Sequence, residues 1–196
     1  MESEVKIIVE EALAKAKSIF NVEDVSVEIN EDPDQVIPET GVGGFTPDSH
    51  TIFVYYDSTN QNLKEKLQQE IKSTVTHEFH HAIRNRIFNW KEDTLLGAMI
   101  TEGLADHFDI EVNGGQPKPW SIALNDDELE KVKGTATPEF NSREYNHDDW
   151  FFGSESRNIP KWAGYAIGFK LVGDYLKKID KKASELVVEP ASSFIL

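Results

Sequence analysis

The chain has 196 residues, of which 39% are hydrophobic and 28% are charged, so it has enough apolar sequence for a folded core. Its 35 acidic residues outnumber its 20 basic residues, and the formal net charge is −15 at pH 7. Such a charge argues against general nucleic-acid binding and against docking on anionic membranes, because both depend on clustered Lys and Arg. The chain has no cysteine, so a metal would have to be held by His, Asp and Glu.

The N-terminal sequence gives an expectation about location. Met1 to Glu4 is acidic where a secretory signal carries positive charge, and no apolar segment of signal-peptide length follows. The longest apolar stretch, 162–169, is far shorter than the ~20 residues of a membrane span. We therefore expect a cytoplasmic protein that does not associate with membranes.

The first third of the chain predicts one helix and two strands. Apolar residues recur at helical spacing over 3–20, with Ser3 as a candidate N-cap. Alternating apolar and polar residues over 25–29 predict a half-buried strand, and the β-branched and aromatic run 51–56 predicts a second. The intervening segment 31–44 is acidic and contains prolines and glycines, which indicates a loop.

The rest of the chain is predominantly helical in pattern. Apolar residues four apart predict a helix over about 61–90, and a second apolar helix over about 94–112 should end at Asn113-Gly114-Gly115. A short helix is expected near 126–133, capped by Asp126 or Asp127, within a long irregular connection over 115–160. A last helix should begin with Pro160 and run to about 179. The simplest organisation is one domain over 1–196.

The segment that carries chemistry is His77-Glu78-Phe79-His80-His81, which contains H-E-x-x-H in a helical context. Side chains four apart on a helix project about 40° apart, and their Cβ atoms are roughly 6 Å apart. The imidazoles of His77 and His81 can therefore bind one ion at Zn–N distances of about 2.0–2.1 Å. Glu78 is displaced from them by about 100°, where it can reach a water at an open coordination position.

The next predicted helix supplies a third ligand. Glu102 follows His81 by 21 positions, and a short turn near 91–94 would let the two helices run antiparallel. Asp106 lies one helical turn beyond Glu102 and could accept the second ring N–H of a ligating histidine. Both carboxylates interrupt an otherwise apolar helix, where a dication would compensate their buried charge. We predict a His₂Glu site that binds Zn²⁺, although manganese, iron or cobalt could take the same ligands.

These motifs resemble a known family. H-E-x-x-H followed by Thr101-Glu102-Gly103-Leu104-Ala105-Asp106 is similar to the gluzincin branch of zinc metalloproteases, and more closely to bacterial proteins catalogued as predicted zinc-dependent proteases. The resemblance extends from about Gly43 to Leu176 and includes Gly44-Phe45-Thr46-Pro47 and the segment 162–168. It implies a zincin-like α+β fold with a small mixed sheet, an active-site helix carrying H-E-x-x-H and a following helix carrying the third ligand. It also implies peptide hydrolysis.

A catalytic scheme follows from such a site. Glu78 would act as general base toward water that attacks a peptide carbonyl, and a second electrophile would stabilise the oxyanion. The candidates for the second electrophile are Tyr165, Tyr145, His147 and Arg157, and we favour Tyr165. The strand 51–56 could be an edge along which an extended peptide adds, which is also what the resemblance to zincins implies.

Two other interpretations stay open. The protein could be a zinc-dependent regulatory or interaction protein that does not turn over substrate, although such a protein would need the ligands and not Glu78. The motif could also have arisen by chance on a structural protein. We expect His80 to lie at the surface or to contact one of the metal-binding residues. We also expect a peptide or protein substrate and no nucleic-acid partner.

Overall fold

A computed structural model describes residues 1–89 and 93–195 of the chain. Contacts within the chain divide it into two compact units. The first comprises Met1–Arg86 and Val112–Gly114, and the second comprises Ile87–Glu111 and Gly115–Leu196. The prediction of a single domain over 1–196 is not decided by this division and stays a prediction.

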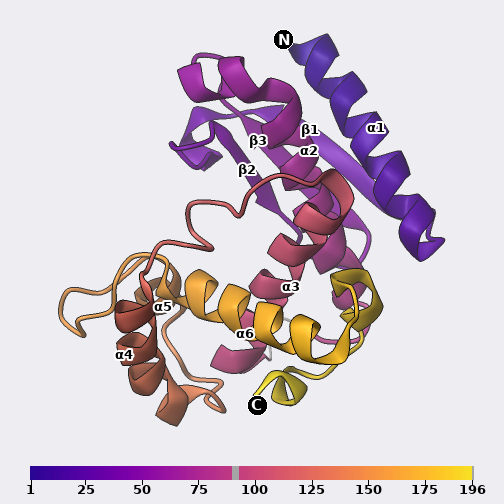
Figure 1. The fold of residues 1–196 in the computed structure, drawn as a ribbon. Helices are drawn as coiled ribbons and strands as arrows, with labels where there is room; N and C mark the ends of the chain where they lie inside the picture. Colours follow the sequence, from indigo (N-terminus) through magenta and orange to yellow (C-terminus); the bar gives the residue numbers. More distant parts are fainter. Residues whose placement is uncertain (90–92, 196) are drawn as a thin grey trace. The chain divides into compact units, whose positions relative to one another are not determined.

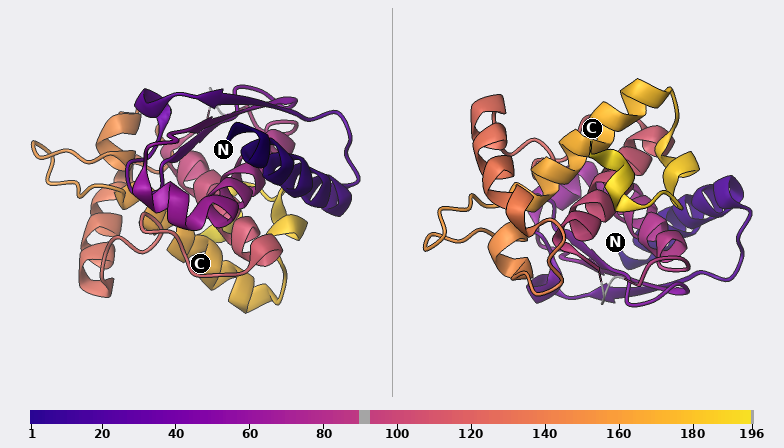
Figure 2. Two further views of the ribbon diagram at one scale, coloured as in Figure 1. Left: turned by 90° about the horizontal axis from the view of Figure 1, so that it is seen from above. Right: turned by 90° about the horizontal axis from the view of Figure 1, so that it is seen from below.

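The first unit is a three-stranded mixed sheet with two helices (Figure 1). The strands are β1 (Ser26–Glu31), β2 (Val42–Phe45) and β3 (Thr51–Tyr56), and the helices are α1 (Glu2–Phe20) and α2 (Gln61–Arg84). Along β3 the residues Ile52, Val54 and Tyr56 are buried while their neighbours are half-buried. Figure 2 shows α1 and α2 on one side of this sheet, and both helices contact strands as well as each other.

The sheet order corrects one expectation about the second predicted strand. The order is β1-β3-β2, with β3 parallel to β1 and antiparallel to β2. β3 is therefore the central strand and has no free edge along which a peptide could add. Three of the four residues of the edge strand β2 lie in the segment 31–44, for which the sequence predicts a loop, because its two glycines and short length conceal the strand pattern.

The second unit is built on helices. They are α3 (Leu95–Asn113, of which the last two residues belong to the first unit), α4 (Asp126–Ala136), α5 (His147–Phe151) and α6 (Ala163–Ile179). α3 and α6 approach so closely that a Cβ on Gly103 would lie 2.4 Å from the backbone of Gly168, and one on Gly168 would lie 1.9 Å from the Met99 carbonyl oxygen. The G-x-x-x-G spacing in α6 thus serves close helix packing.

Helix boundaries differ from the sequence expectations mainly at the caps. α1 has Met1 as its N-cap with Ser3 inside the helix, and Asn125 instead of Asp126 or Asp127 caps α4 through a capping box with Glu128. α2 ends at Arg84, so the predicted continuation of the helix is wrong over residues 85–89, while residues 90–92 lie outside the described part of the chain. α6 begins three residues after Pro160, since its N-cap Trp162 has a left-handed backbone with φ 67°.

The α+β class with a small mixed sheet is confirmed, and six α-helices are present among residues 1–89 and 93–195. Short 3-10 turns complete the chain at Pro33–Gln35, Thr137–Glu139, Ala183–Leu186 and Ala191–Phe194. Within this described part, none of the helices combines the length and the apolar character that crossing a bilayer requires.

Candidate metal centre

The last turns of α2 present two histidines on one face of the helix. The opposite face is buried in the core through Ile71, Val75 and Phe79, which follow one another at four-residue spacing. His77 and His81 are half-buried, their ring centroids are 4.6 Å apart, and their Nε2 atoms lie 3.0 Å apart. The two imidazoles therefore converge through the same ring nitrogen.

This geometry fits a tetrahedral ion. Two nitrogens that each lie about 2.05 Å from a tetrahedral zinc are about 3.3 Å from each other. The observed Nε2–Nε2 separation of 3.0 Å is close to that value, so small rotations of the rings would bring both to ligand distance. The histidine pair thus fits zinc without any change in the helix.

Glu78 lies beside the pair and is largely buried, with 7% of its surface exposed. Thr46 Oγ1 donates a hydrogen bond to Glu78 Oε2 at 2.6 Å and also lies 3.1 Å from the Glu78 carbonyl oxygen. A Cβ placed on Gly44 would lie 2.5 Å from Glu78 Oε1. The carboxylate is therefore held against the end of β2, a contact that the Gly44–Pro47 motif does not reveal in the sequence.

His80 is not a surface histidine, whereas its contact with a metal ligand stays a prediction. It is fully buried, and its ring meets that of Phe20 at 6.4 Å with an interplanar angle of 65°. Phe20 in turn stacks on Phe79 at 6.1 Å. His80 thus belongs to the packing of α1 against α2.

In the second unit, α3 carries the two predicted carboxylates. Glu102 is half-buried, and Asp106, one turn further, is 3% exposed. Asp106 accepts hydrogen bonds from Trp120 Nε1 at 3.1 Å and from Ser121 Oγ at 2.5 Å. Its carboxylate thus fixes the start of the long connection after α3, and the predicted hydrogen bond to a ligating histidine stays a prediction.

The candidate electrophiles occupy different surroundings in the second unit. Tyr165, in the first turn of α6, packs its ring against Trp120 at 6.3 Å and Phe151 at 5.0 Å. Burial, together with the carboxylates of Asp93 and Glu102, raises the pKa of Tyr145 to about 12, so its phenol remains protonated at neutral pH. Tyr145 therefore lies within electrostatic range of the predicted third ligand.

The other two candidates, Arg157 and His147, make contacts that explain their presence without a catalytic role. Arg157 forms ion pairs with Glu139 and Asp149, the latter at 3.2 Å, and lies 5.3 Å from the centroid of the Trp150 ring. His147 is exposed and stacks on Phe151 at 4.3 Å. These contacts favour roles in holding α5, whereas the role of Tyr165 stays a prediction.

Three of the described residues, His77 and His81 on α2 and Glu102 on α3, each offer one atom of the kind that binds a metal ion. Two imidazoles and one carboxylate are the ligand set of many catalytic zinc sites, which keep a further position for water. The donor chemistry therefore fits Zn²⁺.

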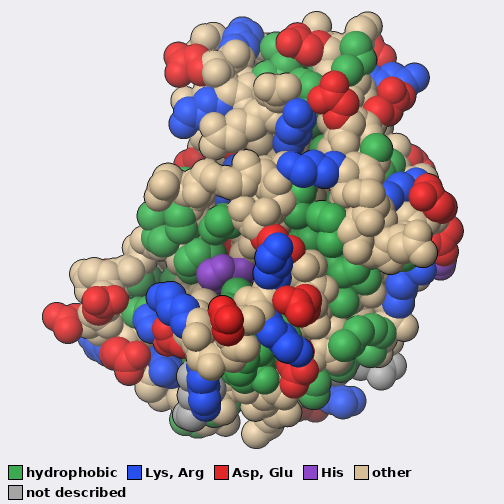
Figure 3. Space-filling model, turned by 45° about the vertical axis from the view of Figure 1, so that its right-hand side comes forward, with side chains coloured by type: hydrophobic (Ala, Val, Ile, Leu, Met, Phe, Trp, Pro, Cys, Tyr) green, Lys and Arg blue, Asp and Glu red, His purple; other side chains and the backbone are tan. Residues whose placement is uncertain are grey.

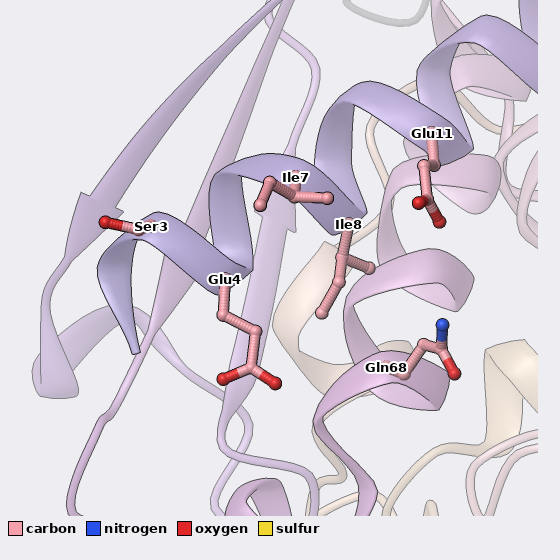
Figure 4. Close-up of a pocket in the computed structure, with 6 residues that line it drawn as sticks. All are labelled: Ser3, Glu4, Ile7, Ile8, Glu11 and Gln68. Atoms are coloured by element: carbon pink, nitrogen blue, oxygen red, sulfur yellow. The ribbon is translucent and has the colours of Figure 1, made fainter.

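A separate pocket of about 520 Å³ lies between α1 and α2. Figure 4 shows that Ser3, Glu4, Ile7, Ile8 and Glu11 of α1 and Gln68 of α2 line it. It contains none of the predicted site residues. The candidate chemistry thus resides at the other end of α2.

The histidine pair on α2 and the carboxylate on α3 are the kinds of donor found in catalytic zinc sites. The chain belongs to the family described as predicted Zn-dependent protease (DUF2268), whose sequence model matches residues 5–196. The predicted family membership is thereby confirmed.

Two curated relatives come from Bacillus subtilis (strain 168). Uncharacterized protein YjaZ is 28% identical over 131 residues, which cover 64% of this chain and 49% of the relative. Uncharacterized protein YjfC is 23% identical over 176 residues, which cover 84% of this chain and 57% of the relative. The chain thus spans about half the length of these relatives. No solved structure matches the chain.

Proposed function

We propose that the protein is a zinc-dependent peptidase of the gluzincin type with a zincin-like fold, acting in the cytoplasm on a peptide or protein substrate. The observation that supports this most directly is the pairing of His77 and His81 on one face of α2, with their Nε2 atoms 3.0 Å apart. Family membership points to the same chemistry, because the family is described as predicted Zn-dependent protease.

In this proposal His77, His81 and Glu102 hold the ion, and Asp106 orients a ligating histidine. Zinc bound there would supply a Lewis acid for the scissile carbonyl and lower the pKa of a water at its open position. Glu78 accepts the proton of the attacking water and returns it to the departing amine nitrogen. Tyr165 donates a hydrogen bond to the developing oxyanion, and Tyr145 is the alternative donor.

The first experiment measures metal stoichiometry by elemental mass spectrometry on tag-free protein. We expect about one zinc per chain in the wild type and a large loss in His81→Ala and in Glu102→Ala. His50→Ala removes an exposed loop histidine and should retain the metal, which makes it the matched control. Zinc content indifferent to both ligand substitutions would overturn the proposed site.

The second experiment separates a peptidase from a zinc-binding regulatory protein. Glu78→Gln keeps the shape of the side chain and removes its basicity, so zinc should be retained while cleavage of a peptide library falls by roughly 10²–10⁴-fold. If the variant cleaves as fast as the wild type, Glu78 is not the base. If zinc-loaded wild type cleaves nothing, the regulatory interpretation is favoured.

A further inference from the structure

At the end of β2, Gly44 and Thr46 lie on the face of the strand that packs against α2. Successive residues of a strand face opposite sides, so Gly44 and Thr46 share one face and Phe45 takes the other. Gly44 pairs with the buried Val54 of β3, whose side faces the helices, whereas Phe45 is 47% exposed. The two residues that flank Phe45 therefore meet α2 at the level of Glu78.

Thr46 and Gly44 lie against different oxygens of the Glu78 carboxylate. Thr46 is 7% exposed, and its hydroxyl is 2.6 Å from Oε2, within the range of charge-assisted hydrogen bonds. A hydroxyl has a single hydrogen, and Oε2 is nearer than the Glu78 carbonyl oxygen at 3.1 Å, so Oε2 is the preferred acceptor. Oε1 and Cγ lie in the space that a Cβ at position 44 would fill, at 2.5 Å from each.

We infer that Gly44 and Thr46 are positioning residues for the catalytic carboxylate: Thr46 anchors Oε2, and the absence of a side chain at Gly44 leaves the space beside the strand that Oε1 occupies. This inference rests on the proposed role of Glu78 as general base. Without the anchor, a Glu side chain rotates among several rotamers, and misplacement of a reacting group by about 1 Å can cost 10²-fold in rate. Both residues would act through Glu78, and neither is proposed to exchange a proton with the substrate.

The test compares Thr46→Val with Thr46→Ser in the zinc-loaded full chain, using steady-state cleavage of a library-derived peptide. Valine keeps the shape and removes the donor, so we expect kcat to fall by at least tenfold, with KM and zinc content within about twofold of the wild type. Serine keeps the donor and loses a buried methyl group, so kcat should recover to within about threefold of the wild type. A purely structural role for Thr46 predicts that serine is no better than valine.

Gly44→Ala provides an independent arm. The added methyl group would have to displace Glu78, and we expect kcat to fall by at least tenfold with zinc retained. Gly134→Ala is the matched control, because nothing lies within 4 Å of the Cβ that it adds on α4. Wild-type kcat in Gly44→Ala would overturn the role of Gly44.

A readout that needs no hydrolysis separates this inference from the proposed function. A double-mutant cycle on unfolding by urea combines Thr46→Val with Glu78→Ala and reports whether the two side chains interact. Additive effects overturn the inference whether or not the protein is a peptidase. If the two side chains interact but Thr46→Val and Thr46→Ser have equal kcat, the inference about Thr46 is also overturned. In that case the proposed function still stands, provided that Glu78→Gln abolishes cleavage.

Discussion

At the scale of single residues, His107 gives the protein a pH-dependent stability. Its ring nitrogen Nε2 lies 2.9 Å from the Phe169 carbonyl oxygen, and the ring stacks on Phe169 at 4.1 Å. Burial lowers the pKa of His107 below its ordinary value of 6.5, although the hydrogen bond to Phe169 opposes this shift. The folded protein therefore favours the neutral imidazole.

The direction of the pH effect follows from proton binding. Between the lowered folded pKa and the unfolded value near 6.5, the unfolded chain binds the proton more tightly, so stability falls as the pH decreases through this range. We expect His107→Gln to reduce the slope of the unfolding free energy against pH below the ordinary histidine pKa of 6.5, measured by urea denaturation. His50→Gln controls for the loss of one histidine, and equal slopes in wild type and His107→Gln would contradict the prediction.

The candidate site could be predicted from the sequence to the extent that its spacing is local. His77, Glu78 and His81 lie within one helical turn and a half, so the period of the helix fixes which of them share a face. The contact of Thr46 with Glu78 joins residues 32 positions apart, and the hydrogen bonds of Trp120 and Ser121 to Asp106 join residues 14 and 15 apart. No pattern within a segment specifies such pairs, because they depend on how segments pack.

At the scale of elements, the contact of α3 with α6 limits the size of the side chain that position 168 can hold. Gly168→Ala would place a methyl carbon 1.9 Å from the Met99 carbonyl oxygen, so the helices would have to separate. We expect this variant to lose about 1–3 kcal/mol of unfolding free energy or more, as overpacked sites do. Urea denaturation followed by circular dichroism measures the loss.

The matched control for this contact is Gly134→Ala on α4, where the new methyl group meets no atom within 4 Å. Alanine favours the helix over glycine by up to about 1 kcal/mol, so this variant should be slightly more stable than the wild type. A Gly168→Ala protein as stable as Gly134→Ala would show that the two helices are not in tight contact.

The elements that the sequence predicted best are those with long, regular patterns. β3 spans the predicted residues Thr51–Tyr56, and α3 begins and ends within one residue of its predicted bounds. β2 was missed because Gly43 and Gly44 remove the alternation of side chains on which strand recognition depends. α5 was missed because five residues are too few for a helical period to show.

At the scale of the whole molecule, the net charge of −15 is accompanied by mixed local charge. On the face drawn in Figure 3, Lys and Arg side chains lie among Asp and Glu side chains. Opposite charges that alternate over a face screen one another at short range, so attraction of a basic substrate would come from the net charge and would weaken with added salt.

Metal removal tests the proposed centre through the stability of the whole chain. A ligand that binds only the folded state stabilises it by about 2.7 kcal/mol at one hundred times its Kd. We therefore expect EDTA to lower the Tm in differential scanning calorimetry and added zinc to restore it. His81→Ala should be insensitive to both treatments, and a wild type that is equally insensitive would argue against a tightly bound metal.

The place of β2 in the sheet has a consequence for self-association. An edge strand offers its unpaired backbone groups to other copies of the same chain, which is a route to aggregation. Here Ile37 forms an antiparallel bridge with Val42, and the Gln35 carbonyl oxygen would lie 2.0 Å from a Cβ on Gly43. The chain's own segment thus shelters the first half of a strand that is only four residues long. The protein can keep a strand beside the candidate base without offering a long edge on which fibrils could nucleate.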